Sequence, residues 1–326
     1  MTKASIIITT HNRPRLLPRA VESARAAGSD VEVVVVDDAS TDETAAVCQQ
    51  IANINYVRVE DNQRVAGARN VGIVVSHGEY LSFLDDDDTR LAGSLDRQID
   101  LLEQAPEAAL IYGQAIVASE AQQDRSYPLE CPQGDIFWKL LSANFIPCGT
   151  VVFRRSCFSR VGLLDERIPG LDDWDFWIRI AETYPVIATE TPVMVWRQSK
   201  PTSGQGSSDT VDLIAQSRKR FREHWLELPR LANAPRSKQR EAWLGFSNNV
   251  AEHLVWETSN AIRRGRLRHA AKSARTALGL HPTSLLRVLR SWTSTATVTT
   301  LLAARRNRDD MASAKAHFKR IRSSRN

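Results

Sequence analysis

The sequence contains few cysteines and no long apolar run. Its four cysteines show no C-x-x-C pair or other spacing typical of a metal site, so we expect reduced thiols. No stretch reaches the roughly 18 apolar residues that a transmembrane helix needs. The first apolar segment, residues 6–8, is far too short for a secretory leader. Together these absences predict a cytoplasmic protein. The cysteines are Cys48, Cys131, Cys148 and Cys157.

Acidic and basic residues are concentrated in different parts of the chain. Residues 205–326 contain 24 Lys/Arg and 9 Asp/Glu, a balance of +15, although the whole chain carries only +5. Residues 1–204 hold the remaining 19 and 29, a balance of −10. An acidic body suits a cation site, and a basic tail suits an anionic surface. The tail has no recognised nucleic-acid-binding module, so nucleic acid is not an expected partner.

Strand-like and helix-like patterns alternate over the first 84 residues. The second strand-like segment is almost entirely valine, as expected of a strand that is buried on both faces. Helical spacing fills the intervals, and Ser40 and Glu43 have the spacing of a capping box before one helix. This alternation predicts an α/β domain with a mainly parallel sheet. The strand-like segments are residues 5–9, 31–36, 55–59 and 80–84.

A segment rich in glycine, serine and proline, residues 199–209, separates this region from a helical one. We place a boundary there, with an α/β domain over residues 1–204 and a basic α-helical extension over residues 205–326. In the extension, Gly265 interrupts a long helical pattern and predicts a helical hairpin. The helices predicted in this part are residues 210–225, 237–263, 267–279 and 283–304.

Four consecutive aspartates, residues 85–88, follow the fourth strand-like segment. Neighbouring carboxylates repel each other, and a buried strand end rarely tolerates them without a cation. Oxygen ligands of this kind suit Mg²⁺ or Mn²⁺. A solvated acidic turn or a weak Ca²⁺ loop has the same local sequence, so the run alone leaves both readings open.

Further polar groups are expected at the same edge of the sheet. Asp37 and Asp38 follow the second strand-like segment, and residues 9–13 follow the first. Arg69 lies near the start of a predicted helix over residues 66–76, where backbone amides and a guanidinium suit phosphate. Ligands bind sheets of this type at the carboxyl ends of the strands. The coincidence favours one ligand site over a set of unrelated turns.

Six segments occur in an order typical of one enzyme family. They are SIIITTHNR, VVVVDDASTDET, NQRVAGARNVGI, GEYLSFLDDDD, FRRSCFSRVGLLDE and LDDWDFWIRI. Together they resemble the motifs of the family-2 inverting glycosyltransferases over about residues 4–197. The resemblance implies a GT-A fold and transfer of a sugar from a nucleotide-diphosphate sugar, with a UDP-sugar as the expected donor. The implied partner is an acceptor glycan or a lipid-linked sugar, in the synthesis of glycans or cell-surface polysaccharides.

The resemblance assigns donor-site roles to the matching positions. Asp38 would bind the base, with Asp37 supporting its loop, and Arg69 would approach the diphosphate. Asp87 is the implied direct ligand of Mn²⁺ or Mg²⁺, and Asp85 would face the ribose or a metal-bound water. The implied donor-binding residues are Thr9, Thr10, Asn12, Asp37, Asp38, Arg69, Asp85 and Asp86, whereas the metal-side residues are Asp87 and Asp85.

The reaction also needs a group that takes the proton of the acceptor hydroxyl. The resemblance places the acidic pair of the family at Asp172 and Asp173, with Asp173 as the catalytic base. Asp172 stands where a glutamate is more usual, and Trp174 has a weaker claim to the acceptor side. A helix N-cap is the alternative role for Asp173, and one residue can serve both purposes.

The sequence departs from the family pattern after Trp196 and Arg197, where Gln198 and Ser199 replace an expected histidine. Two other classes of function stay open. A non-catalytic nucleotide-sugar-binding protein would keep the binding carboxylates but has no need of Asp173. A nucleotidyltransferase would carry glycines after its first strand, and residues 9–13 have none.

The basic C-terminal segment, residues 283–325, combines leucines and a tryptophan at helical spacing with flanking arginines. Such a segment suits peripheral contact with the inner face of the membrane. It equally suits packing on the first domain or binding to a protein partner.

Overall fold

The computed structural model describes residues 2–119, 122–168, 170–197, 210–263 and 265–280. The chain divides into two compact units, Met1–Phe246 and Ser247–Asn326, which we call unit 1 and unit 2. The boundary predicted at residues 204/205 falls outside the described residues and stays a prediction. Helices predicted at 210–225 and at the start of 237–263 belong to unit 1.

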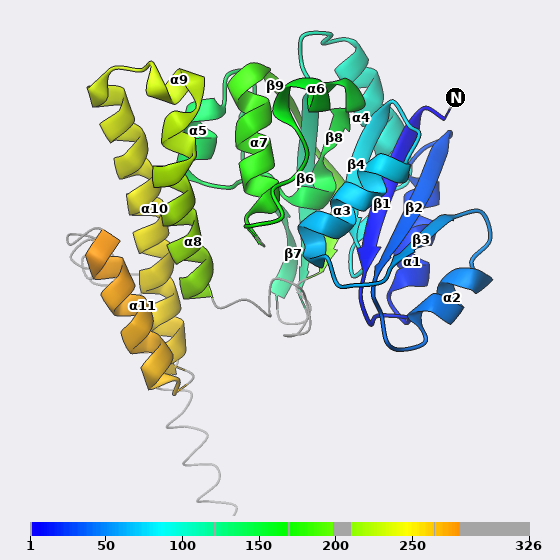
Figure 1. The fold of residues 1–326 in the computed structure, drawn as a ribbon, viewed down its shortest axis with the longest axis horizontal. Helices are drawn as coiled ribbons and strands as arrows, with labels where there is room; N and C mark the ends of the chain where they lie inside the picture. The colour runs from blue at the N-terminus through cyan, green and yellow to red at the C-terminus, as the bar shows by residue number, and fades with distance from the viewer. Residues whose placement is uncertain (1, 120–121, 169, 198–209, 264, 281–326) are drawn as a thin grey trace, which may run out of the picture. The chain divides into compact units, whose positions relative to one another are not determined.

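A mixed sheet of nine strands organises the described part of unit 1 (Figure 1). Its order is β3-β2-β1-β4-β8-β6-β9-β5, and β7 pairs with β6. The first four strands in this order are parallel, which confirms the predicted α/β class, whereas β8, β7 and β5 pair in antiparallel fashion. The strands are β1 (Ala4–Thr10), β2 (Val31–Asp38), β3 (Asn55–Val59), β4 (Tyr80–Asp85), β5 (Thr89–Arg90), β6 (Leu110–Ser119), β7 (Gln122–Tyr127), β8 (Val152–Arg154) and β9 (Val186–Arg197).

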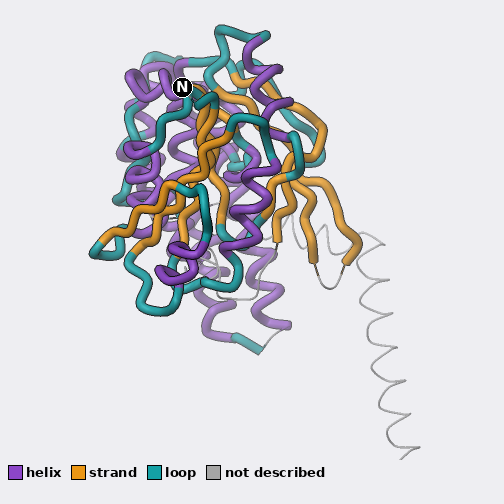
Figure 2. The backbone as a smooth tube through the Cα atoms, turned by 90° about the vertical axis from the view of Figure 1, so that its right-hand side faces the viewer, coloured by secondary structure: helices purple, strands orange, loops and turns teal. Residues whose placement is uncertain are grey.

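Helices flank the strands of unit 1 in both views (Figures 1 and 2). Ile6 and Ile8 of β1 share a core with α1 and α4, whereas Ile7 faces α3 on the other side. Gly72 of α3 permits this contact, because a Cβ atom there would lie 2.3 Å from Cγ2 of Ile7. Burial on both faces explains the valine run of β2. The helices of unit 1 are α1 (Leu17–Ala26), α2 (Thr44–Gln50), α3 (Arg64–Val75), α4 (Ser94–Glu103), α5 (Phe137–Ser142), α6 (Phe158–Val161), α7 (Asp172–Thr183), α8 (Thr210–Glu223) and α9 (Pro229–Ala232).

A helical hairpin forms the described part of unit 2. It consists of the second part of α10 (Arg236–Arg263) and α11 (Leu267–Leu280). The predicted break at Gly265 is confirmed: its φ of +72° suits glycine, and its N–H donates to the carbonyl of Ile262. The helix predicted at 283–304 lies outside the described residues. Among the described helices, none has the length and apolarity needed to cross a bilayer.

Candidate active site

The parallel strands bring the predicted polar segments to one edge of the sheet. In the register of β1, Thr9 is opposite Asp85 of β4 and Thr10 is opposite Asp37 of β2. The three strands therefore end at the same level, and the turns that follow them lie side by side. The structure thus brings together the residues that the sequence placed at 9–13, 37–42 and 85–88.

Asp86 is held against the end of β1. The Thr10 hydroxyl donates to its Oδ2 at 2.7 Å, and Nη1 of Arg13 donates to its Oδ1 at 2.8 Å. Arg13 also lies 3.3 Å from Oδ2 of Asp87. Burial of Asp86 raises the pKa of its carboxyl to about 6, although Arg13 opposes the shift. Asp86 thereby fixes the acidic loop, and its predicted contact with the donor stays a prediction.

The remaining three aspartates of the run form a compact group of oxygens. Asp85, Asp87 and Asp88 each present a carboxylate oxygen, and these atoms lie within 4.8 Å of one another. Burial and the charge of Asp85 raise the pKa of the Asp88 carboxyl. A divalent cation would relieve this repulsion, and the hard oxygen donors fit Mg²⁺ or Mn²⁺. Asp88 is not among the metal-side residues that the resemblance implies, and the structure adds it to this group.

Arg69 links this group to the acidic pair of α7. Its guanidinium donates to Oδ1 of Asp85 and to Oδ2 of Asp172, both at 2.9 Å. The side chain is only 6% exposed and lies over the ring of Phe83. The helix α3 begins at Arg64, earlier than predicted, so Arg69 is in its second turn and not at its N-terminus. Its predicted approach to the diphosphate stays a prediction.

Asp172 and Asp173 are the first two residues of α7, where the helix dipole favours negative charge. Oδ1 of Asp173 accepts the N–H of Trp174 at 2.6 Å, and the Asn144 amide lies 3.4 Å away. Burial and the charge of Asp172 raise the pKa of the Asp173 carboxyl to about 7, while Arg69 opposes the shift. A carboxyl group titrating near neutral pH is suited to general base chemistry.

The turns after β1 and β2 are fixed by hydrogen bonds between them. Asn12 adopts a φ of +55°, and its Oδ1 accepts the N–H of Thr41 at 2.8 Å. Ser40 does not cap α2, as its spacing predicted, because its Oγ accepts the N–H of Asn12 at 2.9 Å. The helix α2 begins four residues later at Thr44, whose N–H donates to Oδ1 of Asp42.

The two aspartates at the end of β2 differ in their surroundings. Asp37 is fully buried, and its carboxylate accepts the N–H of Ser40 at 2.9 Å and the hydroxyl of Tyr56 at 3.0 Å. Asp38 accepts the N–H of Gln63 at 2.6 Å, and burial raises the pKa of its carboxyl. Asp37 therefore stabilises the turn after β2, while its place in the donor site and the base contact of Asp38 stay predictions.

Trp174 is buried in an aromatic cluster of unit 1. Its indole N–H donates to the carbonyl of Leu140 at 2.7 Å, and its ring lies 5.1 Å from that of Trp225 and 6.1 Å from that of Phe246. These contacts place the ring in the packing between α7 and the helices that follow it. Its weak assignment to the acceptor side gains no support from this position.

Three residues near the site were not assigned roles from the sequence. Arg13 pairs with the acidic loop, Asn144 approaches Asp173, and Cys148 lies close enough to be affected by Asp173 and Asp85. Burial and these charges raise the pKa of the Cys148 thiol, so it stays protonated. Only Arg13 had a sequence signal, its position at the end of a strand. The residues that follow Arg197, where a histidine was expected, lie outside the described part.

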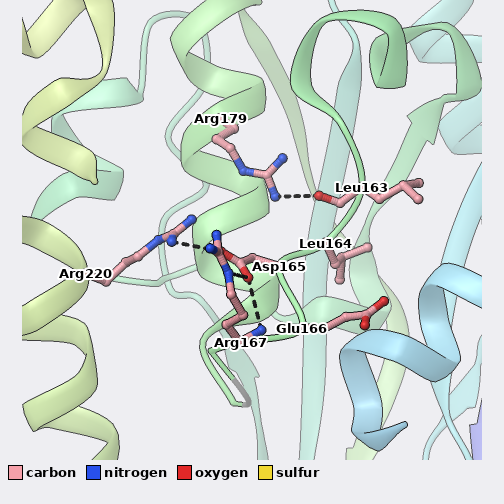
Figure 3. A pocket seen from close by; sticks show the side chains of 7 residues that line it. All are labelled: Leu163, Leu164, Asp165, Glu166, Arg167, Arg179 and Arg220. Atoms are coloured by element: carbon pink, nitrogen blue, oxygen red, sulfur yellow. Dashed lines mark hydrogen bonds and ion pairs between the residues drawn. The ribbon is translucent and has the colours of Figure 1, made fainter. Parts of the chain in front are cut away.

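A cavity of about 530 Å³ lies beside the segment that leads into α7 (Figure 3). Arg220 pairs with Asp165 at 2.8 Å, and Arg167 pairs with the same carboxylate at 2.9 Å. At the edge of the cavity, Oε1 of Glu166 accepts a hydrogen bond from the side-chain amide N–H of Asn70, the neighbour of Arg69. Asp165 thus pairs with two of the three lining arginines, while Arg179 pairs with Asp175 of α7. It is lined by Leu163, Leu164, Asp165, Glu166, Arg167, Arg179 and Arg220.

Comparison with known proteins matches residues 5–162 to the family described as Glycosyl transferase family 2. This stretch is a family-2 glycosyltransferase domain. The chain is 30% identical over 182 residues to an uncharacterized glycosyltransferase of Haemophilus influenzae, covering 55% of this chain and 62% of that protein. Over 134 residues it is 33% identical to the GalNAc(5)-diNAcBac-PP-undecaprenol beta-1,3-glucosyltransferase of Campylobacter jejuni, covering 39% of this chain and 42% of that protein. The chain therefore spans less than two thirds of the length of these relatives.

A similar fold occurs in a solved structure, that of S. aureus TarS 1-349 in complex with UDP-GlcNAc. The TM-score is 0.56 at 16% identity, and the match covers 86% of this chain and 91% of that one. At this identity the likeness concerns the fold alone. The glycosyltransferase domain accordingly has the GT-A architecture that the sequence motifs predicted, followed by C-terminal helices.

Proposed function

We propose that this protein transfers a sugar from a nucleotide-diphosphate sugar, with a UDP-sugar as donor, to an acceptor hydroxyl with inversion. The observation that carries the proposal is the continuous contact from the acidic group to the acidic pair through Arg69. This contact supports the proposal, because one side chain joins carboxylates suited to a cation with a carboxylate suited to act as a general base. Family membership supplies the reaction class, and the site supplies residues for each role.

Asp173 is the proposed base. The acceptor oxygen attacks the anomeric carbon from the side opposite the diphosphate, and Asp173 takes the hydroxyl proton as the new bond forms. The bond from the anomeric carbon to the diphosphate oxygen breaks, and the nucleoside diphosphate leaves. Asp172, paired with Arg69 at 2.9 Å, keeps a negative charge beside Asp173 and so favours its protonation in that step.

Asp85, Asp87 and Asp88 are the residues that would hold Mg²⁺ or Mn²⁺. When bound, such a cation offsets the negative charge that grows on the leaving diphosphate. Asp86 and Arg13 keep the acidic loop in place from the side of β1. The turns after β1 and β2, which are already joined through Asn12 and Ser40, would receive the nucleoside.

The donor and acceptor classes are inferred from similar proteins. TarS 1-349 has been crystallised with UDP-GlcNAc, and the Campylobacter relative is named for a polyprenyl-diphosphate-linked acceptor. A UDP-sugar and an acceptor glycan or lipid-linked sugar are therefore the first candidates for this chain. They would place it in the synthesis of a glycan or a surface polysaccharide.

Calorimetric titration of the full chain with UDP, with and without Mn²⁺, tests the donor site. We expect binding to need the metal and to weaken at least tenfold, about 1.4 kcal/mol, in Asp87→Ala. Asp100→Ala is the matched control, because it removes an exposed aspartate from α4 outside the site. Equal UDP binding by the wild type, Asp87→Ala and Asp100→Ala, with or without metal, would refute the proposed site.

Asp173→Asn separates the transferase from a nucleotide-sugar-binding protein. If the proposal is right, the variant binds UDP as the wild type does but loses hydrolysis and transfer of the donor sugar. Both activities can be followed by release of UDP from a panel of UDP-sugars. Unchanged UDP release in this variant would assign the base to another residue.

A further inference from the structure

The two units carry opposite charge. Unit 2, residues 247–326, contains 16 Lys/Arg and 4 Asp/Glu, a balance of +12. Unit 1 holds the remaining 27 and 34, a balance of −7. The basic character predicted for the C-terminal part is therefore concentrated in unit 2, the smaller of the two. A charge of this sign and density attracts anionic surfaces.

The hairpin of unit 2 buries one side of α11 only. Ala270, Ser273 and Ala277 are at most 5% exposed and lie on this side. Glu257 of α10 accepts from His269 at 3.0 Å and pairs with Arg266 at 3.5 Å, so the start of α11 is fixed to α10. The orientation of α11 within the hairpin is thereby set, and its opposite side is exposed.

The exposed side of α11 combines basic and apolar residues. Arg268, Lys272 and Arg275 follow one another at helical spacing and line a pocket of about 460 Å³. Leu267 and Leu278 are 68% and 44% exposed, and they lie along one edge of this basic row at about 100° per residue. We call these five residues the α11 face. Large apolar side chains that remain in water beside cations are typical of helices that bind in a membrane interface.

The apolar residues decide between two kinds of anionic partner. A nucleic acid or an acidic polysaccharide would be bound by the cations alone, since neither offers an apolar phase to leucine side chains. A lipid surface can bind both the cations and the leucines, because the cations contact the headgroups while the leucines enter the acyl boundary. Elsewhere in the described hairpin, Trp256 and Ile262 of α10 are 61% and 55% exposed, which adds apolar surface to unit 2.

We infer that the α11 face docks on a membrane surface rich in anionic lipid. The inference concerns a surface in unit 2 and stands independently of the proposed sugar transfer in unit 1. It also differs from the contact predicted for residues 283–325, because every residue of the α11 face precedes that segment. Docking through this face would bring the enzyme to the surface where a lipid-linked substrate resides.

Co-sedimentation of the full chain with vesicles tests this docking. One set of vesicles contains phosphatidylcholine alone, and the other contains about one third phosphatidylglycerol. The wild type should bind only the anionic set and should dissociate at about 0.5 M salt. The charge reversal Arg268→Glu, Lys272→Glu and Arg275→Glu should lower the partition coefficient by about a hundredfold or more, since each cation near the surface contributes about fivefold.

The matched control changes net charge equally at another place. Arg97→Glu, Arg236→Glu and Arg240→Glu reverse three exposed cations of unit 1, and this variant should retain vesicle binding. A second variant, Leu267→Gln with Leu278→Gln, keeps all charges and should bind several-fold more weakly. Circular dichroism of each protein verifies that the helices are formed.

Four outcomes would overturn the inference. They are no vesicle binding by the wild type, equal loss in both charge-reversed proteins, equal binding by the Leu267→Gln/Leu278→Gln variant, and full binding after reversal of the α11 face. The last would assign the contact to residues beyond α11. Release of UDP from a UDP-sugar in solution, without vesicles, should be equal in the wild type and the α11 variants. Loss of UDP release in solution would therefore test the proposed sugar transfer, whereas loss of vesicle binding would test the membrane docking.

Discussion

At the scale of single residues, Asp173 can accept a proton only while its carboxyl is ionised. Burial and the charge of Asp172 raise the pKa of this carboxyl to about 7 from an ordinary value of 3.8. We therefore expect kcat to rise with pH through about 7, because protonated Asp173 is inactive below that value. A pH profile of UDP release checks this, and a rate independent of pH between about 5 and 8 would exclude Asp173 as the base.

Arg69 influences the same titration without taking the proton itself. It lies 2.9 Å from Asp172, and its positive charge lowers the pKa of the Asp173 carboxyl. In Arg69→Gln that charge is missing, so the rising part of the pH profile should move to higher pH. Arg69→Lys keeps the positive charge, so the rising part of the pH profile should move less than in Arg69→Gln. A lower kcat with an unmoved profile in Arg69→Gln would show that Arg69 acts only through folding or donor contact.

The position of each site residue in the sequence explains which contacts of the site could be predicted. Asp37 and the acidic run follow strands whose own sequences are apolar, so their position at the edge of the sheet could be inferred locally. The pairing of Arg69 with Asp172 joins residues 103 positions apart. Asn144 and Cys148 approach the acidic pair from the segment between α5 and β8, which has no strand pattern at these two residues. Contacts of this kind depend on tertiary packing, which single segments do not encode.

At the scale of elements, the contact of α3 with β1 positions Arg69 and depends on Gly72. A Cβ atom at Gly72 would lie 2.3 Å from Cγ2 of Ile7, closer than packed carbons allow. Gly72→Ala should therefore destabilise unit 1 by about 1–3 kcal/mol. Thermal unfolding checks this prediction.

Gly279→Ala is the comparison for this substitution, since among the described residues no atom beyond its own helical turn lies within 4 Å of the added methyl group. In an open helix position the change to alanine should be neutral or stabilising by up to about 1 kcal/mol. An equal effect of both substitutions would argue against close packing of α3 on the sheet.

The elements also show where local patterns are insufficient. Strands β1, β2 and β4 were predicted because each carries its own apolar pattern. The capping box at Ser40 and Glu43 was wrong, because the Ser40 hydroxyl accepts from Asn12 in the neighbouring turn. The Ser40 hydroxyl joins the ends of β1 and β2. This nonlocal hydrogen bond takes the place of the local helix-capping bond that the spacing predicted. The strands β7 and β9 lie outside the alternating pattern, and only the folded sheet reveals their pairing.

At the scale of the whole molecule, the acidic loop couples stability to pH and to cations. The pKa values of the Asp86 and Asp88 carboxyls are raised by burial, so the folded state holds their protons more tightly than the unfolded state does. The stability that these groups contribute is thus present at low pH and is lost as pH rises through the raised values. In the absence of a cation, the acidic loop weakens the fold most at alkaline pH.

A divalent cation should reverse this loss, because it binds the ionised oxygens and not the protonated ones. We expect Mn²⁺ at about a hundred times its Kd to stabilise the wild type by about 2.7 kcal/mol. The gain in Tm should be larger near pH 8 than near pH 5, where protons compete for the oxygens of Asp88. Asp87→Ala should lose the gain and Asp100→Ala should keep it. A gain that is larger at pH 5, or that survives in Asp87→Ala, would place the cation elsewhere on this acidic unit.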